Sequence, residues 1–345
     1  MQTPKKLGYR FPAEWETHVA TWVVFPYHEE SFPGIIKEAQ KQFLLLVREI
    51  SKSEIVRIIF HNDDALNIFQ KMSEKYNIEI DNCEFFIFET NDVWCRDFGP
   101  AFLINPNINP KKVIVDWDFN AWGGKFPYFY DNLIPSKIAK KFNYTIFQPG
   151  IIMEGGSVDF NGEGTVITTK SCLLNKNRNS NLTINEIEWY LCQFYGVDQV
   201  IWLEAGIAGD DTDGHVDDIT RFVNANTVVT MIETNKSDDN YEILKKNYEI
   251  LKNTCLINNK KLEIIEIPMP TAIYCDGNRL PASYANFYIT NKSIILPVFG
   301  CPEDKIAIDI FSKIFPDREI IPIDSKIFIH GSGSFHCLTQ QEPMI

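Results

Sequence analysis

The segment that contains Cys337 has the composition of a loop that presents a reactive side chain. HGSGSFHCLTQQ, residues 330–341, places two Gly-Ser pairs ahead of this cysteine. Glycine allows tight backbone turns, so the loop can bring one side chain close to a pocket. A cysteine in that position could act as a nucleophile once it is ionised. A buried and unreactive thiol is the alternative interpretation of the same residues.

An acidic segment, GDDTDGHVDD at residues 209–218, contains a histidine that could take part in catalysis. If this stretch is extended, His215 and Asp217 point to the same face of the chain. A carboxylate beside a histidine fixes its tautomer and keeps it basic, which suits proton transfer. Imidazole and carboxylate groups are also ligands for zinc, manganese or iron. The spacing alone leaves three interpretations open: acid–base catalysis, a metal site, and an acidic turn beside a core histidine.

Other carboxylates and two tryptophans stand beside turns or apolar runs. Glu154 precedes two glycines, so the backbone can turn sharply next to it, although a carboxylate in a solvated turn fits equally well. Asp97 follows Trp94 by three residues, and an aromatic face next to a carboxylate suits a flat cation. Arg96 could instead pair with an internal acid, and Trp122 could form a pocket wall or a core position. A cation-binding pocket is one hypothesis that these residues support.

The chain between these segments alternates helix and strand patterns. Apolar residues recur at three- and four-residue steps over 35–51, and this spacing predicts a helix. The run at 55–60 predicts a strand, and the two acids at 63–64 suit the start of another helix. Further strand-like runs lie at 83–89, 112–117, 165–169, 199–203, 226–232, 261–267 and 293–299, and helical patterns lie around 185–195, 241–253 and 303–314.

This alternation covers the whole length without a linker rich in proline, glycine or serine. We therefore predict a single α/β domain over residues 1–345. A unit of two to three strands and a helix recurs roughly every 60 residues, which suggests an internal structural repeat. Catalytic groups would then be expected where the units converge.

The overall composition and net charge indicate which classes of binding partner the protein favours. The net charge is -13, from 33 Lys and Arg against 46 Asp and Glu, which repels nucleic acid and attracts cations. No run of about 18 apolar residues is present, and the first residues lack the apolar middle of a secretory signal. We expect a cytoplasmic protein without membrane contact. The eight cysteines form no CxxC pair, so we expect free thiols.

Together and in this order, the polar segments resemble those of the agmatine deiminase family, which is grouped with the Porphyromonas-type peptidyl-arginine deiminases in the guanidine-modifying superfamily. The resemblance runs from Phe11 to Pro343 through the motifs NDxWxRDxGP, EGG, LLNKNRN, DTDGHVD, SYxNF and HCxTQQ. It implies a pentein-like α/β fold, a five-bladed propeller of pseudo-repeated ββαβ units around a central channel. It also favours acid–base catalysis without a metal or other cofactor.

The resemblance implies a role for each residue of the cluster. Cys337 would be the nucleophile, His215 the general acid and base, and Glu154 a carboxylate beside them. Asp97 and Asp217 would hold the guanidinium group through forked hydrogen bonds. Because carboxylates raise the pKa of a neighbouring thiol, we expect the bound cation to assist the ionisation of the cysteine.

The resemblance also implies contacts to the rest of the substrate. Asp211 matches a substrate-contacting acid of the family, and Trp94 and Trp122 are expected pocket walls. The tail of agmatine carries only an ammonium group, whereas that of arginine also carries a carboxylate, so acids favour agmatine. We expect its hydrolysis to N-carbamoylputrescine and ammonia through an amidino-cysteine intermediate, within putrescine synthesis, by a homo-oligomer such as a dimer. Deimination of free arginine or peptidyl-arginine is the alternative.

Three rival functions and one departure from the family motif accompany this expectation. The rivals are an amidinotransferase, a metallohydrolase that uses the residues at 211–218, and a non-catalytic binding protein. The departure lies just before the nucleophile, where HGSGSF, residues 330–335, replaces a run resembling Gly-Gly-Gly. Ser332 and Ser334 are small, so we expect the chemistry to survive and the selectivity to be less well defined.

Overall fold

In residues 2–345, which the computed structural model describes, five sheets share one topology. Their strand orders are β18-β1-β2-β3, β4-β5-β6, β7-β8-β9, β10-β11-β12 and β15-β16-β17. The strands are β1 (His18–Val24), β2 (Ile55–Phe60), β3 (Cys83–Ile87), β4 (Ala101–Ile104), β5 (Lys112–Val115), β6 (Thr145–Phe147), β7 (Val158–Phe160), β8 (Thr165–Thr169), β9 (Gln199–Leu203), β10 (Thr220–Asn224), β11 (Thr227–Ile232), β12 (Glu263–Pro268), β15 (Tyr288–Ile289), β16 (Ser293–Val298), β17 (Glu319–Asp324) and β18 (Thr339–Pro343). A separate hairpin pairs β13 (Tyr274–Cys275) with β14 (Asn278–Arg279).

Each of the five sheets begins with an antiparallel pair and continues with parallel strands. Strand β4 is antiparallel to β5, for example, and β5 is parallel to β6. Parallel neighbours need a crossover connection, and a long helix supplies it in every sheet. These crossover helices are α1 (Ile36–Ser51), α2 (Asp63–Tyr76), α5 (Ile134–Phe142), α7 (Ile184–Tyr195), α8 (Tyr241–Lys252) and α9 (Glu303–Ile314).

The long helices begin where local side chains satisfy free backbone N–H groups. The side chain of Asn62 accepts a hydrogen bond from the backbone N–H of Ala65 at 2.9 Å and caps α2. Thr183 and Glu186 form a capping box at the start of α7. Helix α1 buries one apolar face, as its three- and four-residue spacing predicts.

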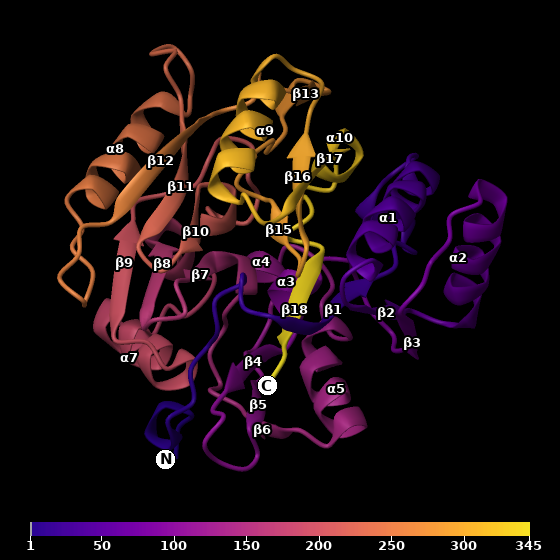
Figure 1. Cartoon of the computed structure of the whole chain (residues 1–345), viewed down its shortest axis with the longest axis horizontal. Coiled ribbons are helices and arrows are strands. Elements are labelled where there is room, and N and C mark those ends of the chain that lie inside the picture. The colour runs from indigo at the N-terminus through magenta and orange to yellow at the C-terminus, as the bar shows by residue number, and fades with distance from the viewer. Residues whose placement is uncertain (1) are drawn as a thin grey trace.

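The long helices lie at the periphery, and two of the four-residue helices lie near the centre (Figure 1). The central helices are α3 (Cys95–Phe98) and α4 (Ala121–Gly124), whereas α6 (Lys170–Leu173) and α10 (Lys326–Ile329) each precede a functional loop. First strands of neighbouring sheets touch, since β7 contacts β10 and β4 contacts β18. Strand β18 pairs with β1, so both ends of the chain join one sheet.

Short turns lead into the first strands of the five sheets. They are α3 before β4, the 3₁₀ helix η4 (Gly155–Ser157) before β7, the 3₁₀ helix η5 (Val216–Asp218) before β10, and the loops before β15 and β18. The remaining 3₁₀ helices are η1 (Lys5–Leu7), η2 (Glu29–Ser31) and η3 (Asp131–Leu133). Turn α3 contacts η4, and η4 contacts η5, so these turns converge on one region.

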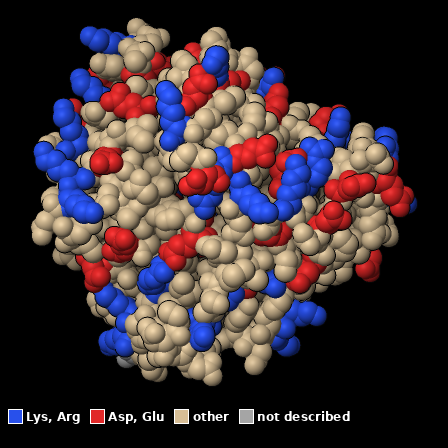
Figure 2. Space-filling model, in the orientation of Figure 1, with Lys and Arg blue, Asp and Glu red and all other residues tan. Residues whose placement is uncertain are grey.

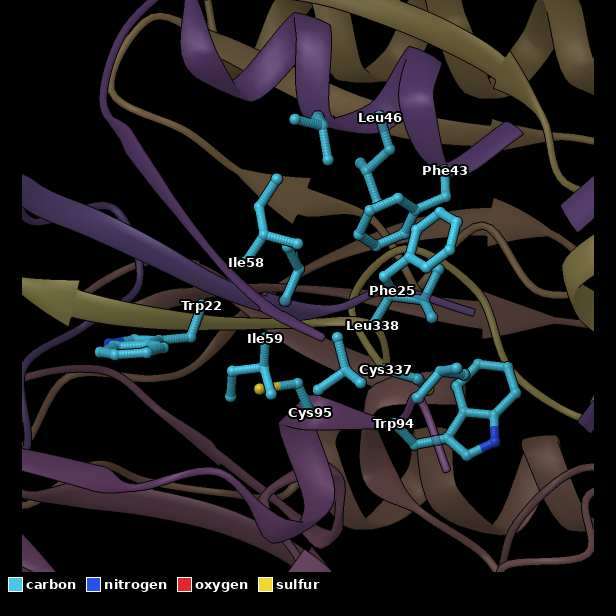
Figure 3. Packing of buried hydrophobic residues seen from close by; sticks show 14 of the residues in the cluster. Trp22, Phe25, Phe43, Leu46, Ile58, Ile59, Trp94, Cys95, Cys337 and Leu338 are labelled. Atoms are coloured by element: carbon cyan, nitrogen blue, oxygen red, sulfur yellow. The ribbon is translucent and has the colours of Figure 1, made fainter. Parts of the chain in front are cut away.

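The largest apolar cluster packs α1 against the sheet that contains both chain ends. Figure 3 shows Phe43 and Leu46 of α1 over Ile58 of β2, with Cys337 and Trp94 at one end of the cluster. The nucleophile candidate is thus attached to a rigid core rather than to a mobile surface loop.

The predicted alternation of helices and strands is confirmed, including the helix at 35–51 and the strands at 55–60, 165–169 and 199–203. The first strand of each sheet was not predicted. Within the described part of the chain, no helix is long and apolar enough to cross a membrane.

Candidate active site

The five residues expected to carry the chemistry come from four of the turns that enter first strands. Asp97 lies in α3, and Glu154 immediately precedes η4. His215 immediately precedes η5, and Asp217 lies within it. Cys337 stands two residues before β18. One structural position, repeated around the molecule, thus contributes every member of the cluster.

The thiol of Cys337 is buried and held by an amide. Its side chain is 4% exposed, and Nδ2 of Asn286 donates a hydrogen bond to Sγ at 3.0 Å. Oδ1 of the same amide accepts from the backbone N–H of Cys337 at 3.2 Å. Sγ also lies 3.6 Å from Oδ2 of Asp217. Burial, followed by the charges of Asp217, Asp218 and Asp97, raises the pKa of the Cys337 thiol well above its ordinary value.

His215 lies between two carboxylates. Its Nδ1 is 3.6 Å from Oδ1 of Asp97, and its Nε2 is 3.8 Å from Oε2 of Glu154. Neither ring nitrogen has a hydrogen-bond partner within residues 2–345. Burial disfavours the charged ring, but Asp97, Cys172 and Glu154 together hold the pKa of His215 well above its ordinary value. An imidazolium here can donate a proton.

Gly156 explains why the EGG motif needs a residue without a side chain. A Cβ atom at this position would lie 2.6 Å from Nδ1 of His215, 2.8 Å from Oδ1 of Asp97 and 2.9 Å from Oδ2 of Asp217. All three separations are shorter than van der Waals contact. The three charged groups therefore surround one glycine, and any larger residue would push them apart.

Asp97 is fixed by hydrogen bonds to both of its oxygens. The backbone N–H of Gly156 donates to Oδ1 at 2.9 Å, and the indole N–H of Trp122 donates to Oδ2 at 2.9 Å. Burial raises the pKa of Asp97 to about 6, an effect that His215 opposes and Asp217 reinforces. Trp122, which was expected as a pocket wall, thus also orients a carboxylate.

Glu154 is paired with a buried arginine. Nε of Arg178 donates to Oε1 of Glu154 at 2.6 Å, and both side chains are fully buried. Burial would raise the pKa of Glu154, but His215 and Arg178 hold it below its ordinary value. Cys172 approaches Oε2 at 3.7 Å. Glu154, Cys172 and His215 bring metal-type donor atoms close together, and of these three residues His215 belongs to the 211–218 segment for which the sequence left metal binding open.

Asp217 has one oxygen in use and one free. Oδ2 accepts a hydrogen bond from Nδ1 of His336 at 2.6 Å. Oδ1 has no hydrogen-bond partner in the described residues, although it is buried. Burial would raise the pKa of Asp217, whereas His336 and His215 lower it. The result is an ionised carboxylate with one unused acceptor.

A cavity of about 460 Å³ opens beside Cys337 and Asp97. The acidic residues around it are Glu30, Asp92, Asp97 and Asp211. Among the described residues that line it, there is neither a lysine nor an arginine. Its walls include the two tryptophans expected from the sequence, Trp94 and Trp122. Such a cavity favours a cation with apolar stretches.

Trp94 explains the glycines that remain in the loop before the nucleophile. A Cβ atom at Gly333 would lie 2.4 Å from the Trp94 ring, and one at Gly331 would lie 2.9 Å from it. Ser332, between them, has a φ of 71°. The loop therefore keeps glycine at both positions that contact the tryptophan and accepts serine where the family motif has glycine.

Asp211 lies on the cavity wall with its carboxylate partly desolvated. Burial and the neighbouring charge of Asp210 raise the pKa of Asp211 to about 6. Lys125 donates a hydrogen bond to the backbone oxygen of Asp211 and forms an ion pair with Asp213 at 3.1 Å. The side chain of Ser332, which also lines the cavity, forms a hydrogen bond with the Asp211 carboxylate and opposes the rise in its pKa.

Backbone strain is concentrated around the cavity. Positive φ values occur at Ala121 (51°), Trp122 (55°), Asp213 (69°) and Ser332 (71°). Residues other than glycine rarely adopt this backbone conformation. Strained residues persist where the surrounding structure holds them, and they cluster at functional sites. Trp122 and Ser332 line the cavity directly.

The sequence analysis named the cluster but missed the groups that hold it in place. The stretch after His215 is a 3₁₀ turn rather than extended, yet His215 and Asp217 still face Gly156 together. The supporting residues that were missed are Glu14, Cys172, Arg178, Asn286 and His336. Arg178, Asn286 and His336 lie within the motifs, whereas Glu14 and Cys172 lie outside them, and no local pattern distinguishes any of the five from its neighbours.

Comparison with known proteins identifies relatives over nearly the whole chain. Residues 10–343 match a family model described as Porphyromonas-type peptidyl-arginine deiminase. A Legionella pneumophila protein that carries a provisional name as an agmatine deiminase is 39% identical over 99% of this chain and 96% of its own.

Solved structures with the same overall fold include two agmatine deiminases. One is a cysteine-to-serine variant from C. jejuni with substrate bound, 35% identical, with a TM-score of 0.88 over 97% of this chain and 96% of that chain. The other, from Enterococcus faecalis, is 29% identical, with a TM-score of 0.92 over 99% of this chain and 98% of that chain. The α/β fold expected from the resemblance is thereby confirmed.

Proposed function

The chain belongs to the Porphyromonas-type peptidyl-arginine deiminase family, and from this premise we propose that it hydrolyses agmatine to N-carbamoylputrescine and ammonia. It is accordingly a hydrolase of C–N bonds in linear amidines with a cysteine nucleophile. The product is a precursor of putrescine, so the reaction serves polyamine synthesis.

The composition of the cavity wall supports agmatine as the substrate over free arginine and peptidyl-arginine. Free arginine and arginine at a peptide terminus carry a carboxylate, which needs a cationic partner at the far end of a pocket. The described residues around the cavity include four carboxylates and no lysine or arginine. An ammonium group on a methylene chain suits this wall, and a carboxylate would be repelled by it.

We assign the grip on the guanidinium group to Asp97 and Asp217. Asp217 has a buried oxygen without a hydrogen-bond partner among the described residues, and this oxygen can accept a guanidinium N–H. Asp97 is already oriented by Gly156 and Trp122 and contributes a second charged acceptor. Two carboxylates at fixed positions hold the planar cation in one orientation next to Cys337.

The proposed reaction has two halves. The thiolate of Cys337 forms an S–C bond with the guanidinium carbon, and one terminal C–N bond breaks as His215 transfers its proton to the departing ammonia. The amidino-cysteine then remains. His215, now neutral, accepts a proton from water, whose oxygen attacks the same carbon. The second proton of this oxygen passes to solvent, the C–S bond breaks, the thiolate is restored and N-carbamoylputrescine leaves. Glu154 stabilises the charged form of His215.

The first half requires a thiolate, although nearby carboxylates oppose it. The substrate cation supplies the missing positive charge when it binds between Asp97, Asp217 and Cys337. Its arrival lowers the pKa of the Cys337 thiol and releases the proton to solvent. We therefore propose that ionisation of the thiol accompanies binding.

The same proposal extends to the whole chain. The five sheets are assigned as blades of a pentein-like propeller, and residues 1–345 as one catalytic domain that works as a homodimer without a metal or other cofactor. The net charge of -13 supports a protein that does not bind nucleic acid. We place the enzyme in the cytoplasm, where agmatine would be its substrate.

Product analysis tests the proposed function. The purified chain is incubated separately with agmatine, free arginine and an arginine-containing peptide, and ammonia and the carbamoyl product are measured. We expect kcat/KM for agmatine to exceed that for arginine by at least about 100-fold, because each arginine substrate introduces an unpaired carboxylate or a bulky backbone. Cys337→Ala serves as the inactive control.

Each rival function predicts a different result in the same assay. A preference for arginine or for the peptide would contradict agmatine as substrate. Activity that is lost with EDTA would indicate a metallohydrolase, and a product that forms only with an added amine would indicate an amidinotransferase.

A further inference from the structure

His336, immediately before the nucleophile, lies between two carboxylates and has no place in the mechanism described so far. Its Nδ1 is 2.6 Å from Oδ2 of Asp217. Its Nε2 is 2.9 Å from Oε2 of Glu14, a residue 322 positions away in the chain. The three side chains are buried, with exposed fractions of 2% for His336, 0% for Asp217 and 7% for Glu14.

These two contacts determine the charge of the ring. A neutral imidazole has one N–H donor and one bare nitrogen lone pair. Between two carboxylates, the lone pair would face an anionic oxygen at hydrogen-bond distance, which is repulsive. An imidazolium donates from both nitrogens and satisfies both acceptors. The ring of His336 is therefore a buried cation as long as Asp217 and Glu14 are ionised.

Glu14 is itself anchored by two arginines, so the far side of the network is rigid. Nη2 of Arg221 lies 3.0 Å from Oε2 of Glu14, and Nη2 of Arg96 lies 3.3 Å from the same oxygen. The backbone N–H of Ile289 donates to Oε1 at 2.9 Å. Glu14 thus fixes the position of the His336 ring, and the ring fixes Oδ2 of Asp217.

We propose that His336 is a positioning residue which, as an imidazolium, keeps Asp217 ionised beside the nucleophile and occupies Oδ2 so that Oδ1 faces the guanidinium group. The inference rests on the proposed function for the identity of that group. It assigns to the histidine of the HCxTQQ motif a role distinct from that of His215. His336 touches neither the substrate cavity nor its wall.

The groups that face His336 from the surrounding elements set the balance of charge. They are Glu14 from the N-terminal segment, Arg96 from α3, Asp159 from β7, Asp217 from η5, Arg221 from β10 and Cys337 beside it. Asp159 is paired with Arg221, so it adds little uncompensated charge. Removing the imidazolium leaves Asp217 next to Asp97 and Asp218 without its nearest cation.

Two substitutions separate the hydrogen bond of His336 from its charge. His336→Gln retains an amide donor without the charge, and His336→Phe removes both. His18→Gln is the matched control, because His18 is also buried and lies 3.0 Å from a carboxylate oxygen of Glu54, outside the cavity wall and the catalytic cluster. The control measures the effect of losing a buried histidine on folding.

The pH profile of kcat/KM is the first readout. When a cation within hydrogen-bond distance of a carboxylate is removed, the pKa of that carboxylate rises by at least about one unit. The acid limb of the wild-type protein reflects the single carboxyl of Asp97, and we expect it to become steeper in His336→Gln and in His336→Phe, because Asp217 then also takes up a proton in this range, and to keep its slope in His18→Gln. An unchanged limb in correctly folded His336→Gln would overturn the inference.

Nitrogen-15 spectra of histidine-labelled protein test the charge of the ring without any substrate. The signals of His336 are assigned by their loss in His336→Gln. Both ring nitrogens should be protonated at neutral pH, and a neutral tautomer would contradict the inference. If the wild-type chain released no ammonia from agmatine, the proposed function would fail, while this spectrum would still decide whether His336 is a cation.

Discussion

Three carboxylates act on the thiol of Cys337, and no side-chain cation of residues 2–345 forms a hydrogen bond with it. Asp217, Asp218 and Asp97 all raise its pKa, in addition to the effect of burial. The nearest polar contact is neutral, from the amide of Asn286. At the scale of single residues, these contacts favour a protonated Cys337 thiol in the free protein, and binding of a cation would favour the thiolate.

Thiolate absorbance in the ultraviolet tests this behaviour. At neutral pH the free protein should show little thiolate attributable to Cys337, since its pKa lies well above the ordinary value. Addition of agmatine to His215→Gln, which lacks the proton donor for ammonia release, should raise the absorbance. The same titration of Cys337→Ser subtracts the other cysteines. Full absorbance before agmatine is added would contradict substrate-assisted ionisation.

The pKa of Asp97 leads to a prediction for the acid limb of the pH profile of kcat/KM. Its pKa is raised to about 6, so it is neutral below that value and charged above it. Binding of the guanidinium group needs the charge, and kcat/KM reports groups of the free enzyme. We expect kcat/KM of the wild-type protein to fall as the pH drops below about 6. A profile that stays flat down to about pH 4 would contradict this assignment.

Asp211 titrates in the same range, because its pKa is also raised to about 6. Asp211→Asn should increase KM for agmatine about tenfold and leave kcat within about twofold, because the side chain contacts the tail rather than the reacting carbon. The acid limb should persist in this variant if Asp97 causes it. An unchanged KM would remove Asp211 from the tail-binding site.

At the scale of elements, the turns that enter the first strands hold the site together. Gly156 occupies the closest approach of three of them. Gly156→Ala should therefore reduce kcat/KM by about 100-fold, because a displacement of about 1 Å is sufficient for such a loss. Steady-state kinetics and a melting curve measure the two consequences separately.

Gly277→Ala is the matched control for this substitution. Gly277 lies in the β13–β14 hairpin with a φ of 79° and no atom within 4 Å of an added Cβ. The Gly277→Ala variant should be somewhat less stable than the wild-type protein and should keep its activity. Equal losses of activity in the two variants would show that Gly156 has no special role.

The sequence predicted the middle strands of the sheets better than the first strands. Middle strands such as β11 and β16 are rich in apolar and β-branched residues, and such runs are easily recognised. First strands such as β10 and β18 are buried but polar, because they surround charged groups. Arg221 in β10 and Gln341 in β18 are almost completely buried, which a hydropathy pattern cannot indicate.

The catalytic cluster could be predicted from motifs, whereas its supporting contacts could not. Motif residues such as His215 and Cys337 stand out because their types are rare and their neighbours are small. The pairing of Glu14 with His336 joins positions 322 residues apart, and it exists only after β18 has paired with β1. Contacts of this kind depend on the topology of the whole chain rather than on local spacing.

At the scale of the whole molecule, the net charge of -13 acts on a cationic substrate at long range. Figure 2 shows that acidic and basic side chains are interspersed on the visible face, without a single large basic patch. The excess of acidic residues therefore attracts agmatine electrostatically, and dissolved salt reduces the range of this attraction. The Debye length is about 10 Å in 0.1 M salt and about 3 Å in 1 M salt.

The dependence of the kinetics on salt follows from this charge. Raising ionic strength from about 0.05 M to about 0.5 M should lower kcat/KM for agmatine several-fold and leave kcat nearly constant. The decrease should be visible as a rise in KM. A value of kcat/KM that is independent of salt would exclude electrostatic attraction as a contribution to binding.

The proposed mechanism requires that the guanidinium carbon becomes bonded to Sγ of Cys337 during the reaction. Mass spectrometry of protein quenched in acid during turnover of agmatine measures this bond directly. We predict a mass increase equal to agmatine minus ammonia on the peptide that carries Cys337, present in Cys172→Ser and absent in Cys337→Ser. An adduct on a different cysteine, or carbamoylputrescine formed by Cys337→Ser at the wild-type rate, would contradict the account.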